Sequence, residues 1–410
     1  MLINEKTWDY VRRHVDDDVR KLALQGVKDA AIDLPMALQQ IAGRKTARTK
    51  LPTWAAVDGI IYPPHLNMEQ CSSEKTARYK AQIVGKGTSM VDLTGGLGVD
   101  FYWLSQQFTH RQYVEQDEAL CTLAEQNFHT LGLDCTVRCC EAATYLAEMS
   151  PVDLIFLDPA RRNEHGGRTY GIADCTPNVL ELLPLLLAKA DTILLKLSPM
   201  LDWRKAVDDI TQHLSSTTQH VSEVHIVGVR NECKELLLVL KKTDAPLRLI
   251  CVNDDSIFEA TASPSQHFSF STSPSTFLHE PNASIMKAGC FAEIEACYPV
   301  RQISPNSHLF LSSDEIADFP GRSFEILAVS STNLQKVYQK FTTDSDNTLL
   351  SLKSANISVR NFPLTVDQLR KKLKLKDGGD TYIFATTLAD GQHRLFVCRR
   401  CLQKYTDTNR

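Results

Sequence analysis

The sequence lacks the features of membrane and secreted proteins. No apolar run among its 410 residues approaches the roughly 18 residues needed to span a bilayer. The first residues, MLINEKTWDYVRRHVDDDVRK, are charged where a secretory signal is apolar. The twelve cysteines are scattered, and the lone C-x-x-C at Cys398 and Cys401 lacks a second pair at zinc spacing. We therefore expect a cytoplasmic protein with reduced thiols, no membrane partner and no metal ion.

The sequence also has little net charge, −4 in all, but that charge is unevenly distributed. Residues 351–410 contain twelve Lys or Arg against five Asp or Glu, whereas the preceding residues contain 33 basic and 44 acidic ones. A basic segment of this kind suits a polyanion such as nucleic acid. The alternative is a solvated basic face, which is the more usual explanation unless a neighbouring domain acts on nucleic acid.

Apolar spacing divides most of the chain into a helical part and an alternating part. Residues 1–87 have apolar positions at helical spacing, interrupted by a proline-containing loop. In residues 88–243, apolar runs alternate with helical segments and then give way to two strand-like runs joined by RNEC. The five runs are SMVDL, RQYVEQD, CTVRC, VDLIFLD and DTILLKLS. This α/β pattern predicts five parallel strands, helices on both faces of the sheet, and a final antiparallel hairpin.

The remainder of the chain is predicted to form small α+β domains. Residues 244–330 contain a Ser/Thr-rich segment, a short helix PNASIMKAGCFAEI and a strand SFEIL. Residues 331–410 alternate again, with a helix NLQKVYQKF and a second helix TVDQLRKKLKLK. Thr365 and Gln368 resemble a capping box for the second helix, and Gly378 with Gly379 resembles its end.

The stretch VDLTGGLGVD places three glycines directly after the first predicted strand. Their G-G-x-G spacing differs from the G-x-G-x-x-G of dinucleotide-binding turns. Glycines at such a turn leave space for a ligand to approach the backbone. Asp100, at the start of the following helix, would repel a pyrophosphate and favour a cationic ligand. S-adenosylmethionine has no phosphate and carries a sulfonium and an ammonium, so it fits this turn better than a nucleotide does.

Acidic residues also stand where the neighbouring strands end, which is where ligands bind in such sheets. Glu115 lies some twenty residues beyond the glycines, where a carboxylate accepts hydrogen bonds from ribose hydroxyls. Glu141 follows the third strand, where it could meet an adenine amino group. Each carboxylate alone could be an ordinary exposed strand end, but the ordered set is harder to explain in that way. The predicted cofactor-binding residues are Asp92, Thr94, Gly95, Gly96, Gly98, Glu115, Glu141 and Asp158.

These motifs resemble those of a known enzyme class. VDLTGGLGVD, YVEQDEAL, CCEAA and FLDPARR are similar to motifs of the class I S-adenosylmethionine-dependent methyltransferases, whose sheet also ends in a hairpin. QCSSEKTARYKAQI, HEPNASIMKAG and the tail from SVRNF to FVCRR further resemble a bacterial family with a C-terminal THUMP-like domain. The resemblance implies an N-terminal helical region (1–87), a Rossmann-like methyltransferase domain (88–243), a small ferredoxin-like module (244–330) and a THUMP-like domain (331–410).

The fourth strand carries the predicted catalytic residues Asp158, Pro159 and Arg161. In amino-methylating members of the class, (D/N)-P-P-(Y/F) stands here, and its first side chain and the proline carbonyl accept hydrogen bonds from the target amine. Ala160 replaces the second proline and Arg161 the aromatic residue, so a flipped base loses its obvious stacking surface. Exocyclic-amine and ring-nitrogen methylation therefore both stay open. Arg161 and Arg162 could stack on a base, bind phosphate, or form a structural ion pair.

Substrate contacts are predicted at the same sheet edge and in the basic tail. Lys196 lies in the apolar fifth strand, where burial demands a partner such as Asp158 or Asp92. Arg168 lies in the polar segment NEHGGRTYG, which could be a substrate lid or an ordinary surface loop. Because THUMP domains are associated with RNA, the resemblance implies RNA docking by the basic tail. The predicted substrate-binding residues are Arg162, Arg168, Lys196, Arg370, Lys371 and Lys374.

The sequence thus predicts an S-adenosylmethionine-dependent methyltransferase acting on a nitrogen of a base in structured RNA, either tRNA or rRNA. One alternative is a methyltransferase that acts on a protein or a small molecule, with the basic tail serving another interaction. A second alternative is a protein that binds S-adenosylmethionine without catalysing a reaction. A hydride-transferring enzyme is disfavoured because the dinucleotide-binding turn is absent.

Overall fold

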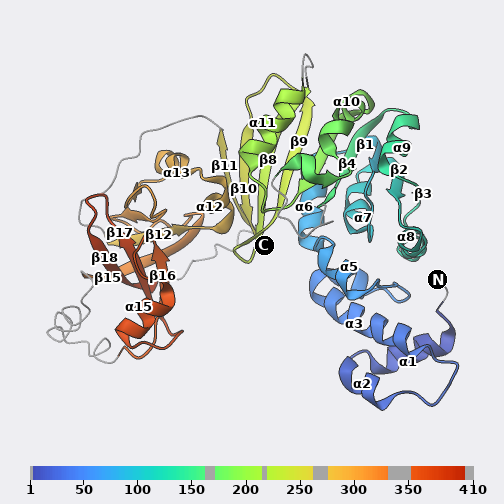
Figure 1. Ribbon diagram of the computed structural model, residues 1–410, viewed down its shortest axis with the longest axis horizontal. Helices are drawn as coiled ribbons and strands as arrows, with labels where there is room; N and C mark the ends of the chain where they lie inside the picture. Colours follow the sequence, from blue (N-terminus) through green and yellow to red (C-terminus); the bar gives the residue numbers. More distant parts are fainter. Residues whose placement is uncertain (1–2, 162–170, 215–218, 262–275, 331–351, 402–410) are drawn as a thin grey trace, which may run out of the picture. The chain divides into compact units, whose positions relative to one another are not determined.

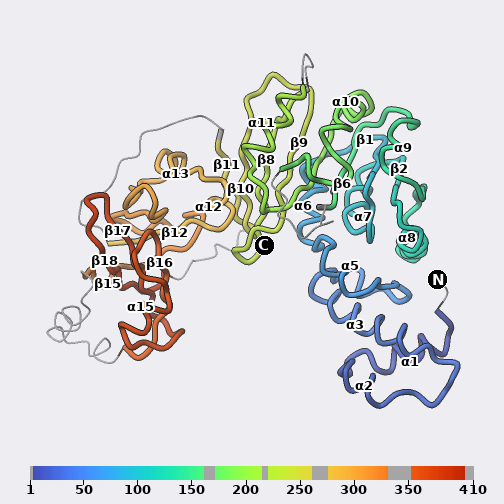
Figure 2. The backbone as a smooth tube through the Cα atoms, in the orientation of Figure 1, coloured from blue at the N-terminus to red at the C-terminus, as the bar shows by residue number. Residues whose placement is uncertain are grey.

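A computed structural model describes residues 3–161, 171–214, 219–261, 276–330 and 352–401 (Figure 1). Its contacts divide the chain into two compact units, Met1–His225 with Glu235–Leu247, and Ile226–Lys234 with Arg248–Arg410. The backbone of each unit can be followed in Figure 2. Within the ranges described, no helix has the length and apolar character required to cross a bilayer. The finer division into four parts, with boundaries after residues 87, 243 and 330, stays a prediction.

The first unit begins with helices, as the apolar spacing predicts. These are α1 (Glu5–His14), α2 (Val19–Gln25), α3 (Leu34–Lys50), α4 (Pro52–Ala55), α5 (His65–Gln70) and α6 (Glu74–Val84). Ser73 caps α6, because its side chain accepts a hydrogen bond from the backbone N–H of Thr76. The neighbouring Ser72 is therefore free to form other hydrogen bonds, and it forms them in the site described below.

The predicted α/β sheet follows and is confirmed. Its elements are β1 (Gly87–Asp92), α7 (Val99–Ser105), β2 (Phe108–Glu115), α8 (Glu118–Thr130), β3 (Thr136–Cys139), α9 (Ala142–Glu148), β4 (Val152–Leu157), β5 (Ala160–Arg161), a 3-10 turn (Ile172–Asp174), β6 (Cys175–Thr176), α10 (Val179–Lys189), β7 (Ala190–Leu197), α11 (Trp203–His213), β8 (Gln219–Val229) and β9 (Glu232–Lys242). In this part of a larger sheet, the strand order is β8-β9-β7-β4-β1-β2-β3, and β5 and β6 form a separate ribbon. Strands β7, β4, β1, β2 and β3 are parallel, and β9 is antiparallel to β7.

The order of these strands positions the site. From β1 the chain first proceeds to β2 and β3 on one side, and then returns to β4 and β7 on the other. Connections that leave a parallel strand pair in opposite directions create a crevice at its carboxyl end. Helices cover the sheet from two sides: α7 packs against α6, whereas α10 packs against α9 and α11 (Figure 1). The carboxyl ends of β1, β2 and β4 thus meet at one edge.

The second unit contains small α+β elements, as predicted. They are β10 (Arg248–Asn253), β11 (Ser256–Thr261), β12 (Phe277–Pro281), α12 (Ala283–Ala288), α13 (Phe291–Cys297), β13 (Arg301–Gln302), β14 (Phe310–Ser312), β15 (Gly321–Ser330), β16 (Asn356–Arg360), α15 (Val366–Leu373), β17 (Thr381–Thr387) and β18 (His393–Arg400). Most of them form a sheet in the order β13-β14-β12-β15-β18-β17-β16. Most of the Ser/Thr-rich segment and the predicted helix NLQKVYQKF lie outside the described residues.

Two helix predictions in this unit were wrong in their boundaries. PNASIMKAGCFAEI forms two helices, because Gly289 has a φ of +69° and ends α12. The capping box of Thr365 and Gln368 is confirmed, but α15 ends at Leu373 with a left-handed Lys374, before the two glycines that were expected to end it. The chain turns there because Leu375 enters the same core as the helix.

Candidate functional site

The glycines between β1 and α7 serve two different purposes. A Cβ atom at Gly95 would lie 2.0 Å from the ring of Tyr113, and one at Gly98 would lie 2.5 Å from the ring of Phe128. Both rings are buried in the core of the first unit. Gly96 has a φ of +55°, and among the described residues the only atom near its Cβ position is a backbone oxygen at 3.9 Å. Two of the three glycines therefore make room for the protein's own rings, and only Gly96 faces open space.

Glu115, at the end of β2, is held in one orientation by backbone donors. Its Oε2 accepts a hydrogen bond from the N–H of Gly96 at 2.8 Å. Its Oε1 accepts from the N–H groups of Gln116 and Asp117 at 2.8 and 3.0 Å. The carboxylate is half-buried. It therefore forms a rigid acceptor that links the end of β2 to the turn after β1.

Asp92, at the end of β1, carries a buried oxygen without a partner. The residue is 1% exposed. Its Oδ1 accepts from the N–H of Thr94 at 2.9 Å, whereas Oδ2 has no hydrogen-bond partner among the described residues. Burial raises the pKa of this carboxyl well above its usual range. A buried acceptor left without a donor is costly, and it marks a place where a ligand's donor group would be stabilised.

Asp158 follows β4 and is the best-positioned candidate for chemistry. Its backbone N–H donates to Oγ1 of Thr94 at 2.7 Å, which joins the ends of β1 and β4. Lys196 of β7 contacts its Oδ2 directly, while 36% of the Asp158 side chain stays exposed. Burial raises the pKa of Asp158, and the charge of Lys196 opposes that rise. Of the two partners predicted for Lys196, Asp158 is the one found.

Lys196 itself is 9% exposed and lies between two carboxylates. Besides Asp158 it approaches Oδ2 of Asp100 at 3.7 Å. Burial lowers its pKa, but the two carboxylates outweigh burial and the net shift is upward, so the ammonium is charged. Lys196 is therefore placed to hold the carboxylate of Asp158, and the substrate contact predicted for it stays a prediction.

Three residues that the sequence did not single out complete this cluster: Ser72, Lys80 and Glu235. Lys80 of α6 is fully buried, contacts Glu235 of β9 and lies 3.1 Å from Oδ1 of Asp100. Asp100 was expected to favour a cationic ligand, but its charge is already balanced by Lys80 and Lys196. Burial raises the pKa of Asp100, yet the two lysines lower it overall. The sequence did contain a hint, because Lys80 is flanked by Ala77 and Ala81 on the buried face of α6.

The side chains of the other residues predicted at this edge have no hydrogen bond to this cluster among the described residues, or lie outside those residues. Glu141 precedes α9, is exposed, and forms no capping hydrogen bond. Pro159 is buried, and the backbone of Arg161 pairs with Cys175 in the ribbon of β5 and β6. Arg162 and Arg168 lie outside the described residues. The structure thus brings together the ends of β1, β2 and β4, and these last two arginines stay predictions.

The predicted basic residues of the tail belong to the second unit and differ among themselves. Arg370 is engaged by Asp377 and Asp367 and is 24% exposed. Lys371 and Lys374 are exposed and have no ion pair within the described parts of the chain. Two more exposed lysines of the same kind, Lys372 and Lys376, accompany them. The free positive charge of α15 is therefore lysine charge.

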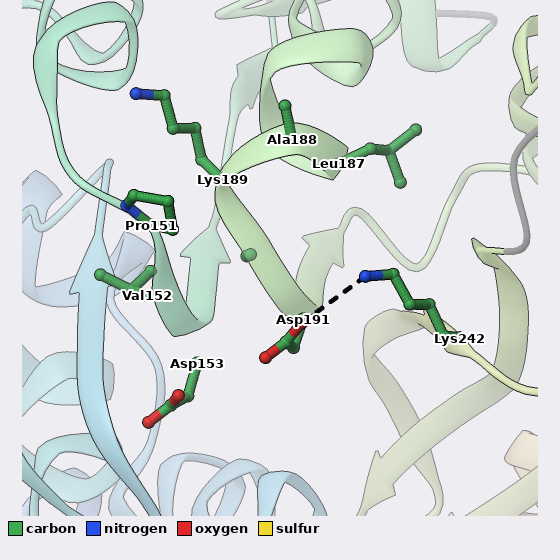
Figure 3. A pocket seen from close by; sticks show the side chains of 9 residues that line it. Pro151, Val152, Asp153, Leu187, Ala188, Lys189, Asp191 and Lys242 are labelled. Atoms are coloured by element: carbon green, nitrogen blue, oxygen red, sulfur yellow. Dashed lines mark ion pairs between the residues drawn. The ribbon is translucent and has the colours of Figure 1, made fainter.

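A small cavity lies at the opposite end of the sheet, where β4 and β7 begin (Figure 3). It has a volume of about 160 Å³ and is lined by Pro151–Asp153, Leu187–Asp191 and Lys242. Figure 3 shows the ion pair of Asp191 and Lys242 across its rim, at 3.8 Å. This volume is below the roughly 300 Å³ of a typical ligand pocket, and the residues at the carboxyl ends of the strands do not reach it.

Comparison with known proteins identifies relatives of the whole chain. A THUMP domain-like family model matches residues 321–400, and a ferredoxin-like domain model matches residues 277–320. A candidate methyltransferase from Porphyromonas gingivalis W83 has a solved structure that is 31% identical and covers 98% of this chain and 100% of its own, with a TM-score of 0.83. No curated protein matches the chain.

Weaker matches to solved structures cover only part of the chain. A candidate class I S-adenosylmethionine-dependent methyltransferase from Listeria monocytogenes is 12% identical over 61% of this chain and 94% of its own, with a TM-score of 0.39. TrmK of M. capricolum, in complex with S-adenosylhomocysteine, is 11% identical over 41% and 68%, with a TM-score of 0.32.

The match to the P. gingivalis protein extends over essentially the full length of both chains, and the THUMP-like model matches the predicted C-terminal region. The sheet order and the hairpin agree with the architecture that the motifs imply. The chain therefore belongs to the family of class I S-adenosylmethionine-dependent methyltransferases that carry a C-terminal THUMP-like domain.

Proposed function

We propose that this protein transfers a methyl group from S-adenosylmethionine to a nitrogen of a base in structured RNA, either tRNA or rRNA. The observation that carries the proposal is the placement of Asp158. Its backbone is tied to Thr94, Lys196 holds its carboxylate, and part of the side chain stays accessible to solvent. A carboxylate fixed in this way can accept a hydrogen bond from a target N–H and direct the nitrogen's lone pair.

The residues at the neighbouring strand ends fit S-adenosylmethionine. The orphaned Oδ2 of Asp92 would accept a hydrogen bond from the ligand's ammonium. Gly96 leaves open space beside the turn, and Glu115 would accept from the ribose hydroxyls. Glu141 is exposed where it could meet the adenine amino group. When bound, the cofactor would supply a methyl group on a sulfonium; the nucleophile bonds to that methyl carbon in line as the carbon–sulfur bond breaks and the neutral thioether leaves.

The protein's part in this reaction is mainly positioning. Asp158 would orient the target nitrogen and accept its proton, and the carbonyl of Pro159 would accept a second hydrogen bond from an exocyclic amine. Arg161 stands where amino-methylating relatives carry a stacking aromatic residue. Both exocyclic and ring nitrogens are therefore compatible with the site. Effective positioning can supply several kcal/mol of a reaction barrier, about 7–11 in well-oriented model systems.

Two features support RNA as the acceptor and the cytoplasm as the location. The THUMP-like domain carries a set of exposed lysines on and after α15 that have no ion pair with any residue the structure describes. Such lysines suit contacts with phosphates, which dominate nucleic-acid affinity. The scattered positions of the twelve cysteines in the sequence favour a reducing compartment, which supports the cytoplasm as the location.

The test is transfer of a labelled methyl group from S-adenosylmethionine to total RNA that lacks native modifications. We expect label in the RNA fraction that is released by ribonuclease treatment. Label in protein or in small molecules would support the corresponding alternative acceptor. Cofactor binding without any transfer would support the non-catalytic alternative. Mapping the labelled nucleotide would then separate an exocyclic amine from a ring nitrogen.

Neutralising the lysines on and directly after α15 should weaken RNA docking without changing the chemical step. We expect the variant Lys371→Gln/Lys372→Gln/Lys374→Gln to have a higher KM for RNA, an unchanged kcat, and a weaker dependence of affinity on salt. The slope of log K against log salt should decrease by about 0.7–0.9 for each RNA phosphate that the variant no longer neutralises. Steady-state kinetics at several salt concentrations measure all three quantities.

The matched control makes the same change at three exposed lysines of the first unit: Lys21, Lys28 and Lys86. It should leave the KM for RNA and the salt slope close to those of the wild type. An equal loss in both variants would attribute the effect to net charge alone and contradict docking by α15.

A further inference from the structure

Four buried charged side chains form a line that leads to the partly exposed Asp158, and we call these five residues the buried charge chain. Its members alternate in sign and come from five elements: Glu235 of β9, Lys80 of α6, Asp100 of α7, Lys196 of β7, and Asp158 after β4. Lys80 contacts Glu235 directly and lies 3.1 Å from Asp100, while Lys196 lies 3.7 Å from Asp100 and contacts Asp158. The chain therefore continues well behind the residues that could meet a substrate.

Lys80 anchors this line because its ammonium is surrounded by three polar groups. Its Nζ contacts Glu235, Asp100, and the hydroxyl of Ser72 at 3.2 Å. The Ser72 hydroxyl lies 2.7 Å from Oδ2 of Asp100 and 3.0 Å from Oε1 of Glu235. Lys80 donates hydrogen bonds to Glu235 and Ser72, whereas its contact with Oδ1 of Asp100 is an ion pair without a hydrogen bond among the described residues. A buried charge between two carboxylates is costly to disturb, because removing one partner leaves another charge uncompensated.

Lys80 and Lys196 are coupled because both form ion pairs with Asp100. Asp100 is shared between Lys80 and Lys196, and Lys196 is shared between Asp100 and Asp158. If Lys80 were absent, Asp100 would draw Lys196 toward itself and away from Asp158. If Glu235 lost its charge, Lys80 would be free to compensate Asp100 more fully, and Lys196 would turn further toward Asp158. The three carboxylates and two lysines leave one net negative charge.

We propose that Lys80 and Glu235 are positioning residues, which determine through Asp100 how firmly Lys196 holds Asp158 as an acceptor for the target nitrogen. This inference rests on the proposed function in one respect: the proposed function identifies the group that donates a hydrogen bond to Asp158. The coupling along the chain is a property of the protein alone and can be measured without any substrate.

The direction in which each neighbouring group shifts the pKa of Asp158 agrees with this coupling. Burial raises the pKa of Asp158, Lys196 and Lys80 lower it, and Asp100 raises it. Two other titratable groups face the same cluster. Asp92 of β1 is buried close enough for Asp158 and Asp100 to raise its pKa, and Cys71, before α6, has a pKa raised by burial. Burial is the largest cause of the upward pKa shift in both groups, and neither forms an ion pair with a member of the chain among the described residues.

The test compares two substitutions with opposite expected effects on Asp158. In Lys80→Met, Lys196 is drawn away and the titration midpoint of the Asp158 carboxyl should rise. In Glu235→Gln it should fall, because Lys80 is released toward Asp100. The probe is carbon-13 NMR of the full-length protein labelled at the aspartate carboxyl carbon, with the Asp158 resonance assigned by its loss in Asp158→Asn. No ligand is added in these titrations.

The same two variants should shift the pH profile of methyl transfer in opposite directions. For Lys80→Met the acidic limb moves to higher pH, with about a tenfold loss of kcat on that limb for each unit of displacement. Glu235→Gln moves the limb to lower pH. The control Lys86→Met makes the same chemical change at an exposed lysine and should move neither the midpoint nor the limb.

The outcomes separate this inference from the proposed function. Midpoints that shift in opposite directions support the coupling, even if no RNA is methylated, in which case only the proposed function fails. Midpoints that do not move, or that move in the same direction in both variants, overturn the inference even if RNA is methylated. If Lys80→Met does not fold, the downward shift expected for Glu235→Gln decides the question alone.

Discussion

Replacing Asp158 with alanine is expected to lower kcat for methyl transfer by about 10²–10⁴, with a much smaller change in the affinity for S-adenosylmethionine, to which Asp158 is one of eight predicted contacts. The loss follows because the substitution removes the acceptor that would orient the target nitrogen. The fold should tolerate this substitution, because 36% of the Asp158 side chain is already exposed and Lys196 keeps Asp100 as a partner. The buried charge chain would then contain two lysines and two carboxylates and be neutral. Single-turnover kinetics and calorimetric titration of the cofactor measure the two quantities separately.

Two companion variants show what Asp158 contributes. Asp158→Asn keeps an acceptor oxygen but loses the carboxylate. Substantial remaining activity in this variant would indicate that Asp158 acts only as a hydrogen-bond acceptor. A loss as large as that of Asp158→Ala would indicate that Asp158 also removes the proton. Glu115→Ala should instead weaken cofactor binding, because a carboxylate held by three backbone donors is lost. A charge-assisted hydrogen bond contributes about 1.5–3 kcal/mol, which is roughly a ten- to hundredfold change in Kd. Intact transfer in Asp158→Ala would falsify the assigned role.

The sheet and the residues at its edge could be predicted because local periodicity specifies them. Five apolar runs separated by helical segments predict the parallel strands, and RNEC predicts the tight hairpin. The carboxyl ends of parallel strands meet at one edge, so the positions of Asp92, Glu115 and Asp158 follow from the strand boundaries. The helix ends in the second unit were harder to predict, because burial of Leu375 ended α15 before the glycines.

The buried charge chain could not be predicted because it joins residues that are distant in the sequence. Lys80 and Glu235 are separated by 155 positions, and Lys196 and Asp158 by 38. On a helix, a lysine every few residues usually indicates the solvent face, and only the alanines around Lys80 suggest burial. Glu235 likewise stands near the start of an apolar strand, and a glutamate at such a position is usually expected to be exposed to solvent. Such charges acquire a partner only when the tertiary structure is known.

The purpose of each glycine in the turn after β1 also could not be predicted from the sequence, because it depends on contacts with distant residues. The sequence predicts that three glycines make room for something, but not for what. Gly95 and Gly98 lie against Tyr113 and Phe128, which are 18 and 30 residues away in the sequence and approach only through the packing of β2 and α8. The ligand interpretation stays a prediction, and Gly96, whose N–H donates to Glu115, is the one of these three glycines with open space for a ligand among the described residues.

Gly95→Ala and Gly96→Ala should therefore fail in different ways. At Gly95 the new methyl group would lie 2.0 Å from the Tyr113 ring, which is fully buried and packed against Phe101 and Phe128 and cannot move aside. Overpacking of this kind costs about 3 kcal/mol of unfolding free energy, at the upper end of its usual range. At Gly96 the methyl group meets open space, and the left-handed backbone costs about 1 kcal/mol.

The measurement is chemical denaturation together with cofactor titration for each variant. Gly95→Ala should be strongly destabilised, and Gly96→Ala mildly destabilised but clearly weaker in cofactor affinity, since its methyl group would occupy the space left beside Glu115. The control Gly171→Ala has an extended φ of −151° and no atom closer than 3.9 Å to its new Cβ among the described residues, so its stability should change by less than about 0.5 kcal/mol. A second substitution, Tyr113→Leu, should recover part of the stability lost in Gly95→Ala, because it removes the ring that the methyl group would strike. If the two turn variants lost stability and affinity in equal proportion, the separation of the glycines into packing and ligand positions would be wrong.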